Sequence, residues 1–227
     1  GVVPGQYTVE TSLVSSGSVL KWFKDQFCTD IAGAADQLGL SVYDIMNRRS
    51  QDIPIGCDGL ILNEYFQGNR TPYSDSKARG VFTGLSLAHT REHMYKAIQE
   101  AVCYGVEANM RKLRDAGFEV KEFVACGGST KSRMWTQMHA DVTGVPITLT
   151  EVGDAVTLGS CILAAAGAGL YGSVQEAADN MVHEREHIEP DMAKHEEYKF
   201  FADKYCEQYP LVQELTHEVV DHVAAAQ

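Results

Sequence analysis

The sequence predicts an α/β domain in which a mixed sheet is flanked by helices. Short apolar runs at residues 59–62, 123–125 and 145–149 have the length and composition of buried strands. Apolar residues at helical spacing lie between and after these runs, most clearly over residues 90–117. Strands that alternate with helices in this way build layered α/β domains.

The composition is that of one globular domain with an acidic surface. The 227 residues are 44% hydrophobic and carry a formal net charge of −12, which is enough apolar material for a substantial core. The negative charge disfavours nucleic acid and anionic membranes as partners. No apolar run has the length of a membrane span, and residues 1–6 have no signal-peptide character.

The six cysteines are scattered along the chain without a Cys-x-x-Cys pair. Single cysteines in apolar surroundings are typical of buried free thiols in a reducing compartment rather than of a disulfide framework. We therefore expect a soluble cytoplasmic protein.

The first third of the chain mixes expected strands and helices. Residues 6–14 alternate in polarity and predict a strand, which residues 15–18 end. Ser41 has the pattern of an N-cap for a short helix through Arg48, and residues 67–75 form a polar turn. Between these segments, one helix is predicted by apolar residues at helical spacing: Val19, Trp22, Phe23 and Phe27.

The longest expected helix runs from an N-cap at Thr90 to a glycine stop at Gly117. Its inner face consists of residues at helical spacing: Met94, Ala97, Ile98, Ala101, Val102, Gly105, Ala108 and Leu113.

The C-terminal third begins with small and apolar residues over 157–169, which predict a buried helix. Ser173 and Glu176 form a capping box for the next helix, and residues 183–190 are expected to be extended. A final helical pattern is interrupted by Pro210. Its aromatic residues recur at helical spacing: Tyr198, Phe201, Tyr205 and Tyr209.

A glycine pair between the strand at 123–125 and the helix that ends at Gly144 is the first candidate site. Gly127 and Gly128 let a ligand approach the main chain without a Cβ in the way. The helix after them offers free N–H groups and a positive dipole end, which suit phosphate. An ordinary tight turn explains the same residues equally well.

Two other motifs have a weaker context. His183-Glu-Arg-Glu-His187 matches the zinc-peptidase pattern, which requires both histidines on one face of a helix and a third metal ligand. Pro190 follows closely and no third ligand is evident, so a solvated surface segment is favoured. Residues 167–172 match Gly-x-Gly-x-x-Gly, but these glycines end a helix rather than open one.

Four motifs appear in the order in which the FGGY carbohydrate kinases carry them in their C-terminal domain. They lie at residues 16–23, 80–100, 127–141 and 158–159 with the Ala-rich helix that follows. The chain therefore resembles that domain, of the xylulokinase and ribulokinase type, over nearly its whole length. It departs from the family pattern at Gln99, where an apolar residue is usual, and at Cys126, where a third glycine is frequent.

The resemblance implies an actin-like, ribonuclease-H-type domain that holds most of the ATP site of a Mg²⁺-dependent sugar kinase. Residues 1–227 are then the C-terminal nucleotide-binding domain. The sugar, a ketopentose or related polyol, is expected to bind mainly to an N-terminal domain outside this sequence. The positions that match the family's nucleotide contacts are Gly17, Lys21, Gly127, Gly128, Ser129 and Ser132.

The same resemblance implies that the catalytic Asp and the phosphate loop precede residue 1. We therefore expect no catalytic residue and no metal site in this chain, an inactive isolated chain, and a sheet that lacks its first strands. Oligomeric state is left open, a homodimer included. Two rival functions remain: a non-enzymatic, ATP-regulated actin-like module, and a zinc peptidase at His183 and His187.

Overall fold

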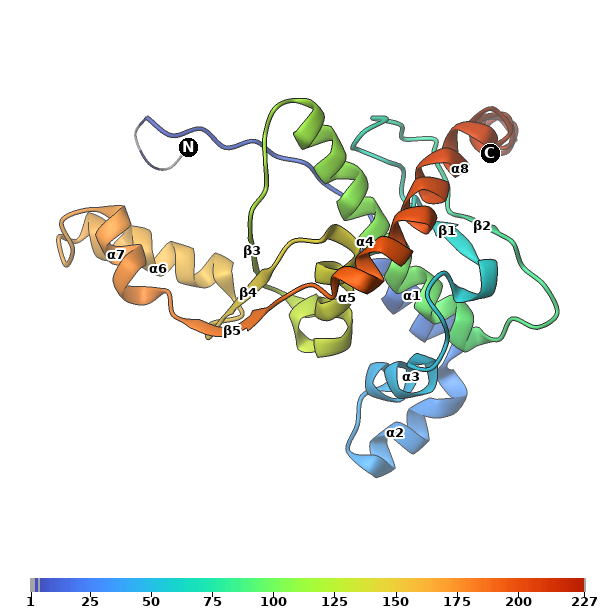
Figure 1. The fold of residues 1–227 in the computed structure, drawn as a ribbon, viewed down its shortest axis with the longest axis horizontal. Helices are drawn as coiled ribbons and strands as arrows, with labels where there is room; N and C mark the ends of the chain where they lie inside the picture. Colours follow the sequence, from blue (N-terminus) through green and yellow to red (C-terminus); the bar gives the residue numbers. More distant parts are fainter. Residues whose placement is uncertain (1–2, 4, 227) are drawn as a thin grey trace.

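Two small sheets lie on either side of a group of helices in the computed structural model, which describes residue 3 and residues 5–226 (Figure 1). Strand β1 (Ile61–Asn63) pairs antiparallel with β2 (Val81–Thr83). The other sheet has the order β3-β4-β5. In it β3 (Phe123–Ala125) is parallel to β4 (Ile147–Thr150), and β5 (Glu184–Ile188) is antiparallel to β4.

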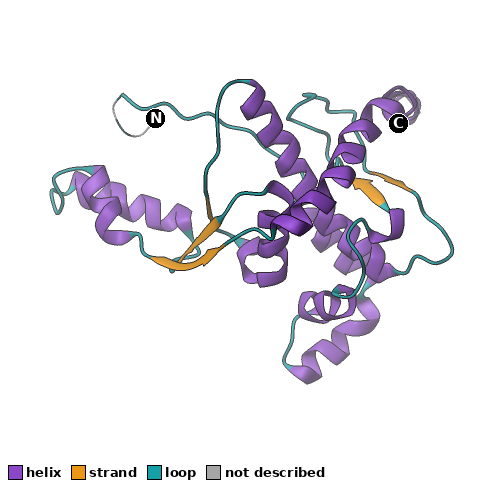
Figure 2. Ribbon diagram, viewed as in Figure 1, coloured by secondary structure: helices purple, strands orange, loops and turns teal. Residues whose placement is uncertain are grey.

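Most of the described residues are helical (Figure 2). The remaining regular structure is the short strands of the two sheets, so the predicted α/β composition is confirmed. The α-helices are α1 (Gly17–Phe27), α2 (Ala32–Leu38), α3 (Val42–Ser50), α4 (Arg91–Asp115), α5 (Arg133–Thr143), α6 (Ala155–Gly167), α7 (Val174–Met181) and α8 (Met192–Ala225). The described residues also form short 3₁₀ turns, namely η1 (Thr29–Ile31), η2 (Cys57–Gly59) and η3 (Gly128–Lys131).

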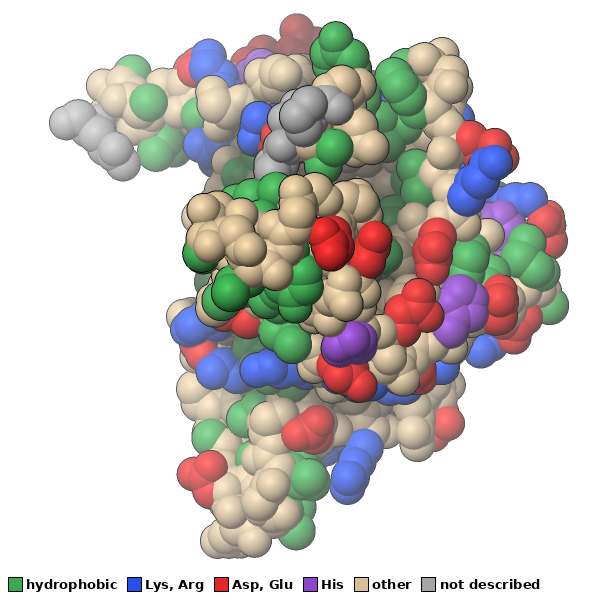
Figure 3. Space-filling model, turned by 90° about the vertical axis from the view of Figure 1, so that its left-hand side faces the viewer, with side chains coloured by type: hydrophobic (Ala, Val, Ile, Leu, Met, Phe, Trp, Pro, Cys, Tyr) green, Lys and Arg blue, Asp and Glu red, His purple; other side chains and the backbone are tan. Residues whose placement is uncertain are grey.

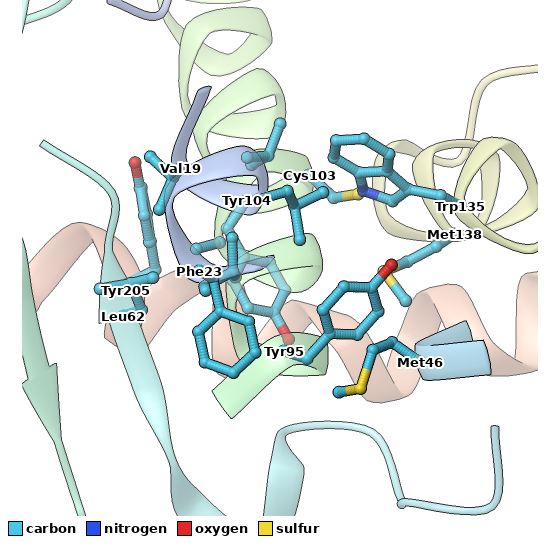
Figure 4. Close-up of a cluster of buried hydrophobic side chains, with 14 of the residues drawn as sticks. Val19, Phe23, Met46, Leu62, Tyr95, Cys103, Tyr104, Trp135, Met138 and Tyr205 are labelled. Atoms are coloured by element: carbon cyan, nitrogen blue, oxygen red, sulfur yellow. The ribbon is translucent and has the colours of Figure 1, made fainter. Parts of the chain in front are cut away.

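Helix α4 is the centre of the main hydrophobic core. Helices α1, α3, α5 and α8 all pack against it. Figure 4 shows the ring of Tyr95 among Phe23, Met46 and Met138, which α1, α3 and α5 contribute. Burying side chains of this size stabilises the fold by about 1.5–3 kcal/mol each. This core fixes the positions of α3 and α5 relative to each other.

The predicted helix boundaries are largely confirmed. Ser41 and Asp44 form the capping box of α3, and Thr90 is the N-cap of α4. Gly144 ends α5, and the glycines after residue 166 end α6 instead of opening a helix. All six cysteines are free thiols, as predicted, but only Cys28, Cys57 and Cys103 are buried. No helix in the described part of the chain has both the length and the apolar character needed to cross a membrane.

The strand predicted at residues 6–14 is wrong. This segment is irregular, and the Tyr7 side chain is 94% exposed. A strand needs a neighbour to bond its N–H and C=O groups, and no strand among the described residues pairs with this segment. Its contacts with the rest of the chain include an exposed ion pair between Glu10 and Arg70 at 3.6 Å and the packing of Leu13 against the main core.

The prediction that the small-residue helix is buried is also wrong. Helix α6 has one buried side chain, Ile162, whereas Val156 is 82% exposed and Leu163 is exposed as well. Its principal contact is the short helix α7. Figure 3 views the molecule from this end, where hydrophobic side chains lie open at the surface. The residues that the structure describes provide no layer over this exposed side of α6.

Pro210 does not interrupt the last helix, contrary to the prediction. Helix α8 continues through it from Met192 to Ala225. A proline removes one backbone hydrogen bond and crowds the preceding turn, but tertiary packing holds both sides. Tyr205 and Tyr209 are fully buried before the proline, and Val212 packs against the core after it.

Candidate nucleotide-binding site

The glycine turn, residues 126–132, lies where two parallel strands end. Strand β3 ends at Ala125 and β4 at Thr150, and a second turn follows β4. The N–H of Gly127 donates to the carbonyl of Gly153 at 3.2 Å, so the two turns are joined. The carboxyl ends of parallel strands are where open α/β sheets bind their ligands.

Gly127 and Gly128 leave the main chain of this turn open. Gly127 has φ +91°, a conformation that L side chains rarely adopt. A Cβ built on either glycine has no heavy atom within 4 Å, and both residues are exposed. The turn is closed from within, because the Thr130 hydroxyl donates to the Gly127 carbonyl at 2.7 Å. A ligand can therefore reach this backbone without displacing protein atoms.

Ser129 and Ser132 shape the entry into α5. Ser129 lies in η3, and its carbonyl accepts from the Ser132 N–H at 3.1 Å. Ser132 is the N-cap of α5, where its Oγ accepts from the backbone N–H of Trp135 at 3.3 Å. An N-cap of this kind satisfies one of the free N–H groups of the helix and leaves its positive end facing the turn.

Asn47 of α3 joins the site, and sequence reasoning missed it. Its side-chain Nδ2 donates to Ser132 Oγ at 3.2 Å. Its Oδ1 accepts from the Tyr95 hydroxyl at 2.9 Å and from Gln99 Nε2 at 3.1 Å. The one signal in the sequence was Gln99, a polar residue where the family usually has an apolar one.

Gly17 and Lys21 form a separate exposed patch at the start of α1. Gly17 is the first residue of the helix, and a Cβ there would meet nothing within 4 Å. Lys21 is 68% exposed in its side chain and pairs with Asp25 one turn later. Among the described residues, no side-chain hydrogen bond or ion pair joins Gly17 or Lys21 to the glycine turn. Both α1 and α5 pack against α4, which relates the two patches through the core.

The zinc-peptidase motif is not formed. His183 precedes β5 and His187 lies within it, so the segment is extended, as predicted, and not helical. Four residues along a strand span about 13 Å, too far for both histidines to bind one metal ion. His187 instead contacts Thr148 Oγ1 at 2.9 Å and Glu189 at 3.1 Å. The described residues hold no cluster of three or more potential metal ligands.

Two carboxyl groups with strongly raised pKa values lie in the core and not at the turn. Burial raises the pKa of Glu64 to about 8 and that of Glu100 to about 7. Glu100 accepts hydrogen bonds from the Gly56 N–H at 3.1 Å and the Tyr104 hydroxyl at 3.2 Å. Neither carboxyl forms a hydrogen bond with the glycine turn.

Known proteins resemble the chain in sequence and in fold. It is 30% identical over 209 residues to xylulose kinase of Bacillus subtilis and 29% identical over 213 residues to autoinducer-2 kinase of Escherichia coli. Each match covers 92% of this chain and 40% of the relative. The structure of xylulose kinase from Rhodospirillum rubrum superposes with a TM-score of 0.75 at 31% identity, over 90% of this chain and 40% of that one.

These relatives are FGGY kinases with the actin-like ATPase fold, so the expected fold is confirmed. The chain spans about 40% of the length of the relatives it matches. The model of the FGGY family of carbohydrate kinases, C-terminal domain, matches residues 1–168, which include the first motif, the long helix, the glycine turn and α6. The chain therefore belongs to the FGGY family of carbohydrate kinases.

Proposed function

We propose that this chain supplies the nucleotide-binding half of an ATP-dependent sugar kinase. One observation carries the proposal: the glycine turn is sterically open at the carboxyl ends of two parallel strands and leads into a capped helix N-terminus. Open glycines admit a nucleotide against the main chain, and the helix end favours its phosphates. Membership of a kinase family supports the same function.

In this proposal, residues 1–227 are the C-terminal domain of a two-domain enzyme. Gly127, Gly128, Ser129 and Ser132 contact the nucleotide from one side, and the α1 patch with Lys21 meets it when the domains close. Mg²⁺ would arrive with the phosphates, since the described residues hold no metal cluster of their own. The bound metal would neutralise charge on the transferred phosphoryl group.

The acceptor is proposed to be a ketopentose or a related polyol. The resemblance to a xylulose kinase and to an autoinducer-2 kinase supports a small polyhydroxylated acceptor but favours neither substrate, because the two identities are nearly equal. The domain that the relatives carry beyond the matched 40% is where we place sugar binding and the catalytic base.

A titration of the purified chain with ADP, and a phosphoryl-transfer assay of the full-length protein with a panel of sugars, test the proposal. We expect the chain to bind ADP and to release none from ATP plus sugar, whereas the full-length protein phosphorylates at least one polyol. ADP binding without phosphoryl transfer by the full-length protein would instead support an ATP-regulated, non-enzymatic module. A chain that binds no adenine nucleotide would refute the proposed site.

A further inference from the structure

A chain of side-chain hydrogen bonds runs from the core to the glycine turn. Tyr95 and Gln99, one turn apart on α4, both donate to Oδ1 of Asn47 on α3, at 2.9 and 3.1 Å. Nδ2 of Asn47 then donates to Ser132 Oγ on the turn, at 3.2 Å. Three separate helices therefore meet at one amide group.

The two donors on α4 decide which way the Asn47 amide faces. An amide has an acceptor side and a donor side. Because Tyr95 and Gln99 occupy the acceptor side, the NH₂ group is turned to Ser132. The Gln99 side chain has little room to move, since it is 1% exposed. The Gln99 backbone carbonyl also accepts from the Trp135 indole at 3.1 Å, which ties this turn of α4 to α5.

The Ser132 hydroxyl can therefore interact with a further group only as a hydrogen-bond donor. Its oxygen accepts from Asn47 Nδ2 at 3.2 Å and from the Trp135 N–H at 3.3 Å. A hydroxyl oxygen accepts about two hydrogen bonds and donates one. Both acceptor positions are occupied, so the O–H is free to donate to a ligand at the exposed side of the turn.

We propose that Asn47 is a positioning residue that makes Ser132 a donor toward the nucleotide. The inference rests on the proposed nucleotide site and adds the chemistry of one contact. The group that meets Ser132 is a hydrogen-bond acceptor, such as a ribose oxygen, a base nitrogen or a phosphate oxygen. The same inference explains why residue 99 is a glutamine. Its side chain donates to Asn47 and holds the amide, which the apolar residue usual at this position would not do.

The decisive variant is Asn47→Asp, tested by ADP titration of the chain. The new carboxylate has nearly the shape of the amide and still accepts from Tyr95 and Gln99, but it takes the hydrogen of Ser132 for itself. We expect ADP affinity to fall about tenfold, because the nucleotide loses the hydrogen bond from Ser132 and its acceptor atom is left without a partner. Affinity should recover as the pH is lowered toward the pKa of the introduced carboxyl, because a protonated carboxyl again donates to Ser132.

A double-mutant cycle with Ser132→Ala separates this effect from simple charge repulsion. In the Ser132→Ala background, Asn47→Asp should reduce ADP affinity clearly less than it does in the wild type, because no hydroxyl remains to be reoriented. An equal loss of affinity in both backgrounds would overturn the inference. Wild-type chain that binds no ADP would refute the proposed function itself, and Asn47 would then have nothing to position.

Gln99→Leu provides a second variant should Asn47→Asp fail to fold. The Gln99 Oε1 atom is buried without a hydrogen-bond partner, so an apolar side chain of similar size should keep the unfolding temperature near that of the wild type. Loss of one of the two donors should still weaken ADP binding about threefold. Unchanged ADP affinity in this folded variant would contradict the positioning role.

Discussion

The hydroxyl of Tyr205 on α8 donates a hydrogen bond to the carboxyl of Glu64 at 2.9 Å, deep within the core. Glu64 directly follows β1 and is 1% exposed. Burial without a cationic partner disfavours the carboxylate and raises the pKa of Glu64 to about 8 from its usual 4.5. The group is therefore mostly protonated in the folded protein at neutral pH.

This pair makes stability dependent on pH. The pKa of Glu64 is higher in the folded than in the unfolded chain. Its contribution to the unfolding free energy is therefore fully present below about pH 4.5 and is lost as the pH rises toward about 8. Within this window the Glu64 contribution has a slope of up to about 1.4 kcal/mol per pH unit. We expect Glu64→Gln to flatten the dependence of the unfolding free energy on pH, measured by urea denaturation, whereas Glu119→Gln at the surface leaves it unchanged. An unaltered slope in Glu64→Gln would show that Glu64 does not titrate in this range.

Gly84, which follows β2, is expected to tolerate no side chain. Its φ is +86°, and a Cβ there would lie 2.1 Å from the backbone carbonyl oxygen of Gly59. Gly117 is the matched control, because it has the same φ of +86° but nothing within 4 Å of the Cβ position. Gly117→Ala should cost about 1 kcal/mol from the left-handed conformation alone, and Gly84→Ala about 3 kcal/mol or more. Equal losses in chemical denaturation would contradict the steric explanation.

Gly128→Leu should weaken nucleotide binding strongly and leave the fold intact. The position is exposed with open space around its Cβ, so the unfolding free energy should change by no more than about 0.5 kcal/mol. The new side chain occupies the space proposed for the nucleotide, and we expect ADP affinity to fall by about tenfold or more. Gly33→Leu, at another unobstructed glycine, should leave ADP binding unchanged. Wild-type affinity in Gly128→Leu would make the turn purely structural.

Lys21 is expected to contribute to binding more than to stability. Its side chain is mostly exposed, and surface ion pairs such as Lys21–Asp25 stabilise little. We expect Lys21→Met to weaken ADP binding about three- to tenfold, with a larger effect at low salt because the attraction to phosphate is electrostatic. Lys24 pairs with the same Asp25 at 2.9 Å, so Lys24→Met is the control for loss of the ion pair. If both variants bind ADP equally well, Lys21 has no role in the site.

Much of the local structure was evident in the residue pattern. The capping box at Ser41, the extent of α4 and the strand-turn-helix unit around Gly127 were predicted within a few residues. These features depend on side chains that lie close together in sequence. The family also followed from the order of its motifs, and with it the list of expected nucleotide contacts.

The errors concern features that depend on distant partners. Residues 6–14 have the alternation of a strand, but strand formation requires a neighbour, and the described chain offers none. Helix α6 has the composition of a buried helix, yet its burial depends on a covering layer that the described residues do not supply. Pro210 would break an isolated helix, but tertiary packing before and after it keeps α8 continuous.

The glycine turn shows the same division at the level of the site. The residue pattern alone was enough to predict that Gly127 and Gly128 leave the backbone open and that a helix begins at Ser132, because neighbouring residues set both features. The contact between Asn47 and the hydroxyl of Ser132, 85 positions later, became visible only in the folded chain, as did the hydrogen bond by which Gln99 holds the Asn47 amide. Both α3 and α5 pack against α4, and this core packing brings the two side chains together and sets the direction of the hydrogen bond at the turn.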